Sequence, residues 1–147
     1  MAVEAPIDQL LDAAASCWMR RRAGWNTTVP GLLLVRPDGP VFFANANPLR
    51  LGVLQLLGTT SPPPRVVVLD LSSSFRLSLP TLDTLTELHD ELHQRGAELW
   101  LARVRGSATA ELQASGLAHR LEPAQLHADL DAAAAAFTST KPQAHPD

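Results

Sequence analysis

Cysteine is nearly absent from this 147-residue sequence, because Cys17 is the only one. A single thiol excludes an internal disulfide framework and fits a reducing cytoplasm. A membrane-spanning helix needs about 18 uninterrupted apolar residues, and the longest apolar runs, such as Val66–Leu69, only have the length of a strand. Acidic residues near the N-terminus argue against a signal peptide. We therefore expect a soluble, cytoplasmic chain.

The overall charge gives no sign of a polyanionic partner. The formal net charge is −3 and the sequence pI is about 5.9, so we expect no nucleic acid to bind. Hydrophobic residues make up 46% of the chain, which is typical of a soluble globular protein. A chain of this length can bury a core without disulfides or metals, and we expect no cofactor.

The two ends of the chain differ from its middle. Apolar residues recur at helical spacing over residues 7–23, which predicts an N-terminal helix followed by a linker to residue 28. Arg20–Arg22 lie between Trp18 and Trp25. These arginines either complement the dipole of a helix end or follow a membrane span in a longer transporter. Residues 138–147 are polar and proline-broken, so we expect a disordered tail.

Strand and helix signals alternate between residues 29 and 137. Runs at 32–36 and 41–43, joined by turn residues, indicate a hairpin. Further strands are expected at 66–69 and 99–104. Helices are predicted from Asn47 to Gly58, from Ser78 to Gly96, from Ser107 to about Gly116 and from Pro123 to about Phe137. The order β-β-α-β-α-β-α-α predicts an α/β fold with a mostly parallel sheet of four or five strands packed by helices.

This order, together with particular segments, resembles the STAS family (sulfate transporter and anti-sigma factor antagonist). Residues 29–35 (Val-Pro-Gly-Leu-Leu-Leu-Val) and 39–47 (Gly-Pro-Val-Phe-Phe-Ala-Asn-Ala-Asn) resemble the opening of STAS domains in bacterial SulP transporters. Residues 66–72 resemble the third strand with its terminal aspartate, and residues 85–106 resemble the helix and strand that follow. The resemblance covers roughly residues 29–137, and it rests on the order and spacing of these segments.

The resemblance implies a non-catalytic regulatory or docking role instead of an enzyme. It implies a protein partner, which is either a SulP-type anion (sulfate) transporter at the inner face of the membrane or an anti-sigma-type regulator. In the second case the chain would be a stand-alone partner-switching antagonist. The resemblance fixes no oligomeric state.

The loop that carries the family's phosphorylation site is altered in this sequence. Bacterial STAS antagonists carry an Asp-Ser-Ser-Gly-like segment at the start of the helix that follows the third strand, and its second serine is phosphorylated. Placing Leu77 at the family's apolar position puts Ser78 at the aspartate, Pro80 at the phosphorylated residue and Thr81 at the glycine. Proline has no hydroxyl, so phosphorylation would need Ser78 or Thr81. The structural alternative is that Ser78 caps the helix and Pro80 occupies its first turn.

Asp70 ends a buried strand, at the edge where open α/β sheets bind their ligands. Its carboxylate is expected to orient the next loop by accepting backbone N–H bonds. The candidate interaction or ligand surface comprises this loop and the two helix starts near it: Asp70, Ser72, Ser73, Ser74, Ser78, Thr81, Asn45 and Asn47.

Other chemistry has less support from the sequence. An anion or a nucleotide is an alternative ligand for this loop, although the sequence has no Gly-x-x-x-x-Gly-Lys-Ser/Thr loop for phosphates. His89 and His93 have the helical spacing of metal ligands, but no third ligand is evident nearby, so we expect no metal. The serines lack a Gly-x-Ser-x-Gly elbow and an activating histidine, so no catalytic residue is assigned.

Overall fold

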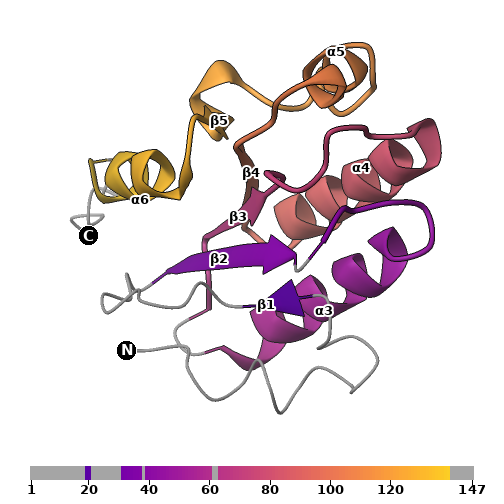
Figure 1. Cartoon of the computed structure of the whole chain (residues 1–147). Coiled ribbons are helices and arrows are strands. Elements are labelled where there is room, and N and C mark those ends of the chain that lie inside the picture. The colour runs from indigo at the N-terminus through magenta and orange to yellow at the C-terminus, as the bar shows by residue number, and fades with distance from the viewer. Residues whose placement is uncertain (1–18, 21–30, 38, 61–62, 140–147) are drawn as a thin grey trace.

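The computed structural model describes residues 19–20, 31–37, 39–60 and 63–139. Its sheet has the strand order β1-β2-β3-β4-β5 (Figure 1). The strands are β1 (Met19–Arg20), β2 (Leu32–Pro37), β3 (Val66–Asp70), β4 (Glu98–Ala102) and β5 (Leu126–His127). Strands β2 to β5 are parallel, and β1 pairs antiparallel with β2 at the edge. The mostly parallel sheet is therefore confirmed.

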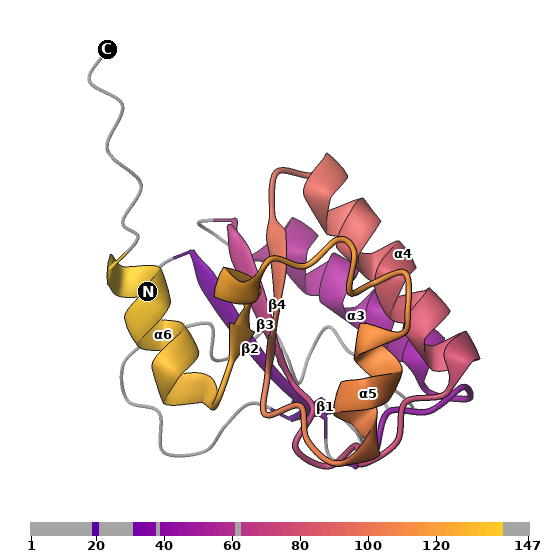
Figure 2. The same cartoon turned by 90° about the horizontal axis from the view of Figure 1, so that it is seen from above.

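Helices cover both faces of this sheet, but unequally. Figure 2 shows α3 (Ala46–Thr59), α4 (Leu79–Gln94) and α5 (Ser107–Gln113) on one face and α6 (Leu130–Ser139) on the other. The larger core lies under α3, α4 and α5, and the smaller one under α6. All residues of β3 are buried, as expected for a central parallel strand.

Side-chain alternation along β3 places Asp70 on the α6 face. Val66 and Val68 belong to the core under α6, whereas Val67 and Leu69 belong to the larger core. Because successive strand residues point to opposite faces, Asp70 lies on the same face as Val68. This face is covered by one helix only, and at its edge the Asp70 side chain is buried beside two partly exposed arginines, Arg36 and Arg103.

The expected hairpin of residues 32–36 with 41–43 is wrong. Residues 41–43 form an irregular loop, and the antiparallel neighbour of β2 is β1. The side chain of Asn45 explains the difference, because it builds a turn that competes with strand pairing. Its Oδ1 accepts a hydrogen bond from the backbone N–H of Phe42 at 2.8 Å, and its Nδ2 donates to the carbonyl of Pro40 at 2.9 Å.

The ends of the first two predicted helices also need correction. The expected helix over 7–23 is contradicted at residues 19–20, which form β1, while residues 7–18 and 21–23 lie outside the described part. The helix expected to start at Asn47 begins at Ala46, with Asn45 in the capping position. Its inner face is formed by Leu49, Val53 and Leu56, which are fully buried.

The final helix predicted over 123–137 is three separate elements. Pro123–Gln125 form a 3₁₀ turn, residues 126–127 form β5, and α6 begins only at Leu130. Pairing of Leu126 with Leu101 holds this stretch extended. The carboxylate of Asp129 accepts a hydrogen bond from the N–H of Ala132 at 2.7 Å and so starts α6. Residues 138 and 139 belong to α6, and the rest of the expected tail lies outside the described part.

Among the residues that the structure describes, no helix combines the length and the apolar character needed to cross a membrane.

Candidate functional site

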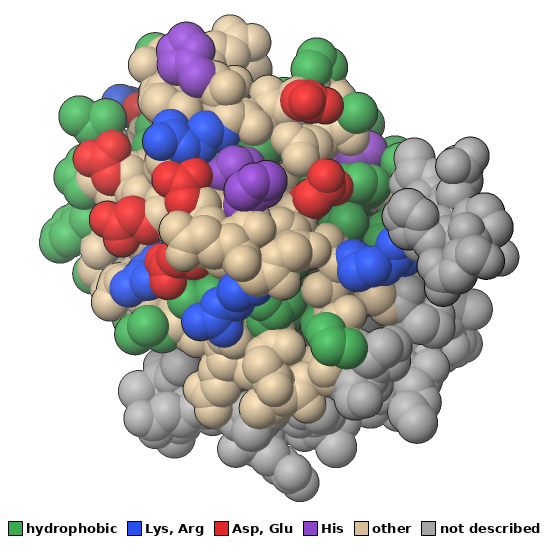
Figure 3. Space-filling model, turned by 180° about the vertical axis from the view of Figure 1, so that it is seen from behind, with side chains coloured by type: hydrophobic (Ala, Val, Ile, Leu, Met, Phe, Trp, Pro, Cys, Tyr) green, Lys and Arg blue, Asp and Glu red, His purple; other side chains and the backbone are tan. Residues whose placement is uncertain are grey.

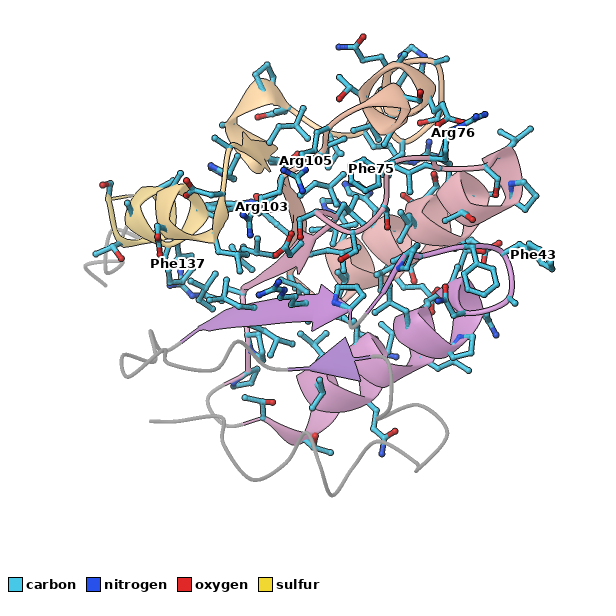
Figure 4. All side chains as sticks on the ribbon, in the orientation of Figure 1. Phe43, Phe75, Arg76, Arg103, Arg105 and Phe137 are labelled. Carbon is cyan, nitrogen blue, oxygen red and sulfur yellow. The ribbon has the colours of Figure 1, made fainter. Side chains whose placement is uncertain are left out.

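The candidate site lies at the carboxyl ends of β2, β3 and β4. The loop after β3, residues 71–78, leads into α4, and the segment after β4 carries Arg103 and Arg105 (Figure 4). Residues 40–45, which precede α3, lie at the same edge, because the N–H of Val41 donates a hydrogen bond to Ser74 in the loop after β3. Side chains that are distant in sequence are thus brought together because parallel strands end at one edge of the sheet.

Asp70 is the buried charge of this edge. Its Oδ1 accepts a hydrogen bond from the backbone N–H of Ser72 at 2.9 Å, as the sequence predicted. Its Oδ2 lies 3.9 Å from Nε of Arg36 and 3.8 Å from a terminal guanidinium nitrogen of Arg103, without a hydrogen bond to either. The Asp70 side chain is 0% exposed, so two arginines balance its charge where water does not reach it.

The serines after β3 mainly organise the backbone. Oγ of Ser74 accepts a hydrogen bond from the N–H of Val41 at 2.9 Å, and Ser74 is buried. The carbonyl of Ser72 accepts one from the Arg105 guanidinium at 3.1 Å. Ser73 is half-buried. The loop is therefore fixed from both sides, by the segment before α3 and by the segment after β4.

Ser78 and Thr81 lie together in the first turn of α4. Ser78 is the capping residue, and Pro80 lies in the first turn, as predicted. The Ser78 hydroxyl makes no capping bond to the backbone; it is 2.9 Å from the hydroxyl of Thr81. Ser78 is exposed, whereas Thr81 is fully buried. Of these two hydroxyls, only that of Ser78 can therefore meet a kinase without opening the helix.

The two asparagines have different local roles. Asn45 shapes the turn before α3, whereas Oδ1 of Asn47 accepts a hydrogen bond from Nε of Arg50 at 3.0 Å within the helix. The hydrogen bond from the Val41 N–H to Ser74 Oγ connects the segment that contains Asn45 to the loop after β3.

Sequence reasoning missed the exposed apolar residues of this edge. Phe42, Phe43, Phe75 and Leu79 are 47%, 73%, 60% and 66% exposed, respectively. We call these four residues the apolar edge. The sequence pattern predicts a strand over residues 41–43, which would bury one ring of the Phe42–Phe43 pair. Figure 4 shows Phe43 and Phe75 on the two segments that the Val41–Ser74 hydrogen bond joins.

Arginines gather at the carboxyl ends of the strands, although the whole chain has a net charge of −3. Arg36 and Arg103 flank Asp70, and the Arg105 guanidinium lies 5.7 Å from the centre of the Phe75 ring. Arg76, 78% exposed, pairs with Glu111 at 3.4 Å. The sequence could have placed two of these arginines at this edge. Arg103 and Arg105 follow the end of β4, and Asp70 ends the neighbouring parallel strand β3.

The histidine pair makes no metal centre in the part of the chain that is described. The rings of His89 and His93 stack with centroids 6.4 Å apart, and Nδ1 of His89 is 3.1 Å from the carboxylate of Asp90. No group of three potential ligands occurs among the described residues. Figure 3 shows histidine side chains among acidic and basic ones on the surface behind the view of Figure 1, as on a solvated helix face.

Comparison with known proteins connects this geometry to one family. The family model for the STAS domain matches residues 26–133. A probable sulfate transporter of Mycobacterium tuberculosis (strain H37Rv) is 32% identical over 109 residues, which are 74% of this chain and 20% of the transporter. The chain thus spans about a fifth of the length of that relative.

Solved structures share the fold. A sulfate transporter family protein from Wolinella succinogenes matches with a TM-score of 0.66 and 22% identity, over 78% of this chain and 92% of that one. The SulP transporter STAS domain from Vibrio cholerae matches with a TM-score of 0.64 and 21% identity, over 79% and 88% of the two chains. The murine anion transporter Slc26a9 matches with a TM-score of 0.65 and 16% identity, over 82% of this chain and 22% of the transporter.

Proposed function

This chain belongs to the STAS domain family, and from that premise we propose that it is a non-catalytic regulatory and docking module for a SulP-type anion (sulfate) transporter. The partner is a membrane protein, so the module works in the cytoplasm at the inner face of the membrane. Relatives that are sulfate transporters and solved SulP STAS domains support this choice of partner.

The observation that carries the proposal is the apolar edge. Large apolar side chains with more than half of their surface exposed, such as Phe43 and Phe75, are costly to keep in water. Phenylalanine and arginine are enriched at protein interfaces, where a few such residues supply most of the affinity. Arg105 stacks over Phe75 and fixes an aromatic and a cation side by side. A partner that covers this edge would bury both.

A non-catalytic role agrees with how the polar groups of the edge are used. Oγ of Ser74 accepts a backbone hydrogen bond, and the hydroxyls of Ser78 and Thr81 contact each other. A serine nucleophile needs a base within hydrogen-bond reach, and these contacts are structural instead. The edge is therefore suited to contact and not to bond-breaking chemistry.

The second candidate function is that of an anti-sigma factor antagonist, and the exposure of Ser78 favours it. Ser78 stands at the start of α4, a 16-residue helix, whose positive end would stabilise a phosphate. A kinase-like regulator could dock on the same apolar edge and modify Ser78. Pro80 at the family's usual phosphorylation position argues against this alternative.

The test is affinity capture with the tagged full chain from native lysate that includes detergent-solubilised membranes. Mass spectrometry identifies the captured proteins and the phosphorylation state of residues 72–81. Recovery of a SulP-type transporter with these residues unmodified supports the docking function. Recovery of a kinase-like regulator with phosphate on Ser78 replaces it by the partner-switching function.

A further inference from the structure

We propose that Asp70, Arg36 and Arg103 form a binding site for a small oxyanion that carries a hydroxyl group, such as hydrogencarbonate or hydrogen phosphate. This site contains none of the residues of the apolar edge, and its binding of an anion would need no protein partner. The inference does not rest on the docking function, because anion binding is measurable without any partner.

The first observation is the unused oxygen of Asp70. Oδ1 has a donor in the N–H of Ser72, whereas the buried Oδ2 has no hydrogen-bond partner. A buried carboxylate oxygen without a donor is unfavourable. A ligand that donates one hydrogen bond to Oδ2 would remove this cost.

The second observation is that the guanidinium groups of the two arginines lie close to Oδ2 without donating a hydrogen bond to it. Nitrogens of Arg36 and Arg103 lie 3.9 Å and 3.8 Å from Oδ2, beyond hydrogen-bond distance. In the described part of the chain, neither guanidinium donates a hydrogen bond. Two guanidinium groups around one carboxylate leave one excess positive charge, which suits an anion that accepts their donors.

The backbone of Arg103 provides a third observation. Its φ is 60°, in the left-handed region that a residue with a side chain enters at a cost. Such conformations persist where the surrounding structure requires them, often at ligand sites. Here the residue in this conformation is the one whose guanidinium lies beside Asp70.

The ligand class follows from the donors and acceptors that the site offers. An ionised carboxylate only accepts hydrogen bonds, and a guanidinium only donates them. Sulfate has no proton to give Oδ2 and would place negative charge against the carboxylate. Hydrogencarbonate and hydrogen phosphate have a hydroxyl for Oδ2 and charged oxygens for the arginines. A site built to bind a hydroxyl rejects the analogue without one.

The ligand can enter from solvent. The side chains of Arg36 and Arg103 are 47% and 37% exposed, and the proposal requires one guanidinium to move outward so that the ligand reaches the buried Oδ2. The site lies at the carboxyl end of the central strand, on the face that α6 alone covers. Ligands of open parallel sheets bind at this edge.

The experiment is a nuclear magnetic resonance titration of the intact chain at mildly alkaline pH. Sodium phosphate, sodium hydrogencarbonate and sodium sulfate are added at matched ionic strength. The backbone amide of Ser72, which donates to Asp70, is the reporter. We expect the two hydroxyl-bearing anions to shift this amide saturably, with an affinity about tenfold or more above that of sulfate.

Three variants and one control sharpen the result. Asp70→Asn keeps an oxygen for the Ser72 amide but turns the other position into a donor, so the preference should reverse in favour of sulfate. Arg36→Gln and Arg103→Gln should each weaken phosphate binding about tenfold or more. Arg95→Gln removes an exposed arginine at the far end of α4 and should change nothing.

Equal, non-saturating shifts with all three anions would overturn the proposal and leave an ion pair with a structural role only. The same conclusion would follow if Arg36→Gln and Arg103→Gln titrated like Arg95→Gln. These arginine variants keep the test decisive even if Asp70→Asn fails to fold.

Discussion

Oγ of Ser74 accepts a hydrogen bond from the backbone N–H of Val41 at 2.9 Å, across 33 positions of sequence. Both residues are buried, so this bond is shielded from water. It joins the segment before α3, which carries Phe42 and Phe43, to the loop that carries Phe75. The Ser74 hydroxyl therefore contributes to the relative position of these two segments.

Ser74→Ala should destabilise the protein by about 1–3 kcal/mol, because the buried N–H of Val41 would lose its acceptor. Urea denaturation of both proteins measures the difference in the free energy of unfolding. Ser73→Ala is the control, since Ser73 is half-buried and should change stability by less than about 0.5 kcal/mol. Equal effects of the two substitutions would show that the Val41–Ser74 bond does not hold the loops together.

Arg103→Gly should be more stable than Arg103→Ala by about 1 kcal/mol. Both variants lose the charge beside Asp70, but glycine adopts a φ of 60° without the steric cost that alanine bears. The comparison therefore isolates the backbone strain from the ion pair. Thermal and urea unfolding of the two variants provide the numbers, and an alanine variant as stable as the glycine variant would contradict the strained conformation.

Phosphate mimicry at Ser78 separates the two candidate functions. Ser78→Asp places a negative charge at the start of α4, which should raise the free energy of unfolding by about 0.3–1 kcal/mol. The two functions differ in which protein the wild-type chain captures, a transporter or a kinase-like regulator. Under partner switching, Ser78→Asp should release the captured regulator, and a regulator that is still captured by the folded variant would contradict that function.

His127 should make stability depend on pH in the mildly acidic range. Its ring packs against Trp100 with centroids 4.8 Å apart. Burial lowers the pKa of His127 below its ordinary value of 6.5, and a hydrogen bond with the backbone of Ala124 opposes this shift by a smaller amount. Below pH 6.5 the unfolded chain therefore binds more protons at this residue than the folded chain.

The free energy of unfolding should consequently fall as the pH falls below 6.5, and this effect should vanish above that pH. Urea denaturation at a series of pH values, with wild type and His127→Gln, measures the slope. The variant should show a flatter dependence over this range. Identical slopes would mean that His127 titrates alike in the folded and unfolded states.

The central elements of the fold could be predicted because their burial is visible in the sequence. Every residue of Val66–Leu69 is apolar, as a strand buried on both faces requires, and β3 is such a strand. The spacing of Leu82, Leu85, Leu88 and Leu92 defines the inner face of α4. The hydrogen bond from the Ser72 N–H to Asp70 followed from the place of Asp70 at the end of this buried strand.

The peripheral elements depended on tertiary contacts that periodicity does not encode. Phe42 and Phe43 are apolar and yet exposed, because the side chain of Asn45 folds their segment into a turn. Two residues of β5 are extended only because β4 lies beside them. Arg36 approaches Asp70 from a neighbouring strand, and their meeting required the sheet order.

The most direct test of the docking function is the amount of SulP-type transporter captured by Phe75→Ser relative to Leu51→Ser. Both substitutions remove one large exposed side chain, 60% and 52% exposed, but Leu51 lies on α3 and is not a residue of the apolar edge. We predict that Phe75→Ser reduces capture at least about tenfold, as expected for a central interface residue, while Leu51→Ser captures like wild type. Equal capture by both variants would contradict a docking function for this edge.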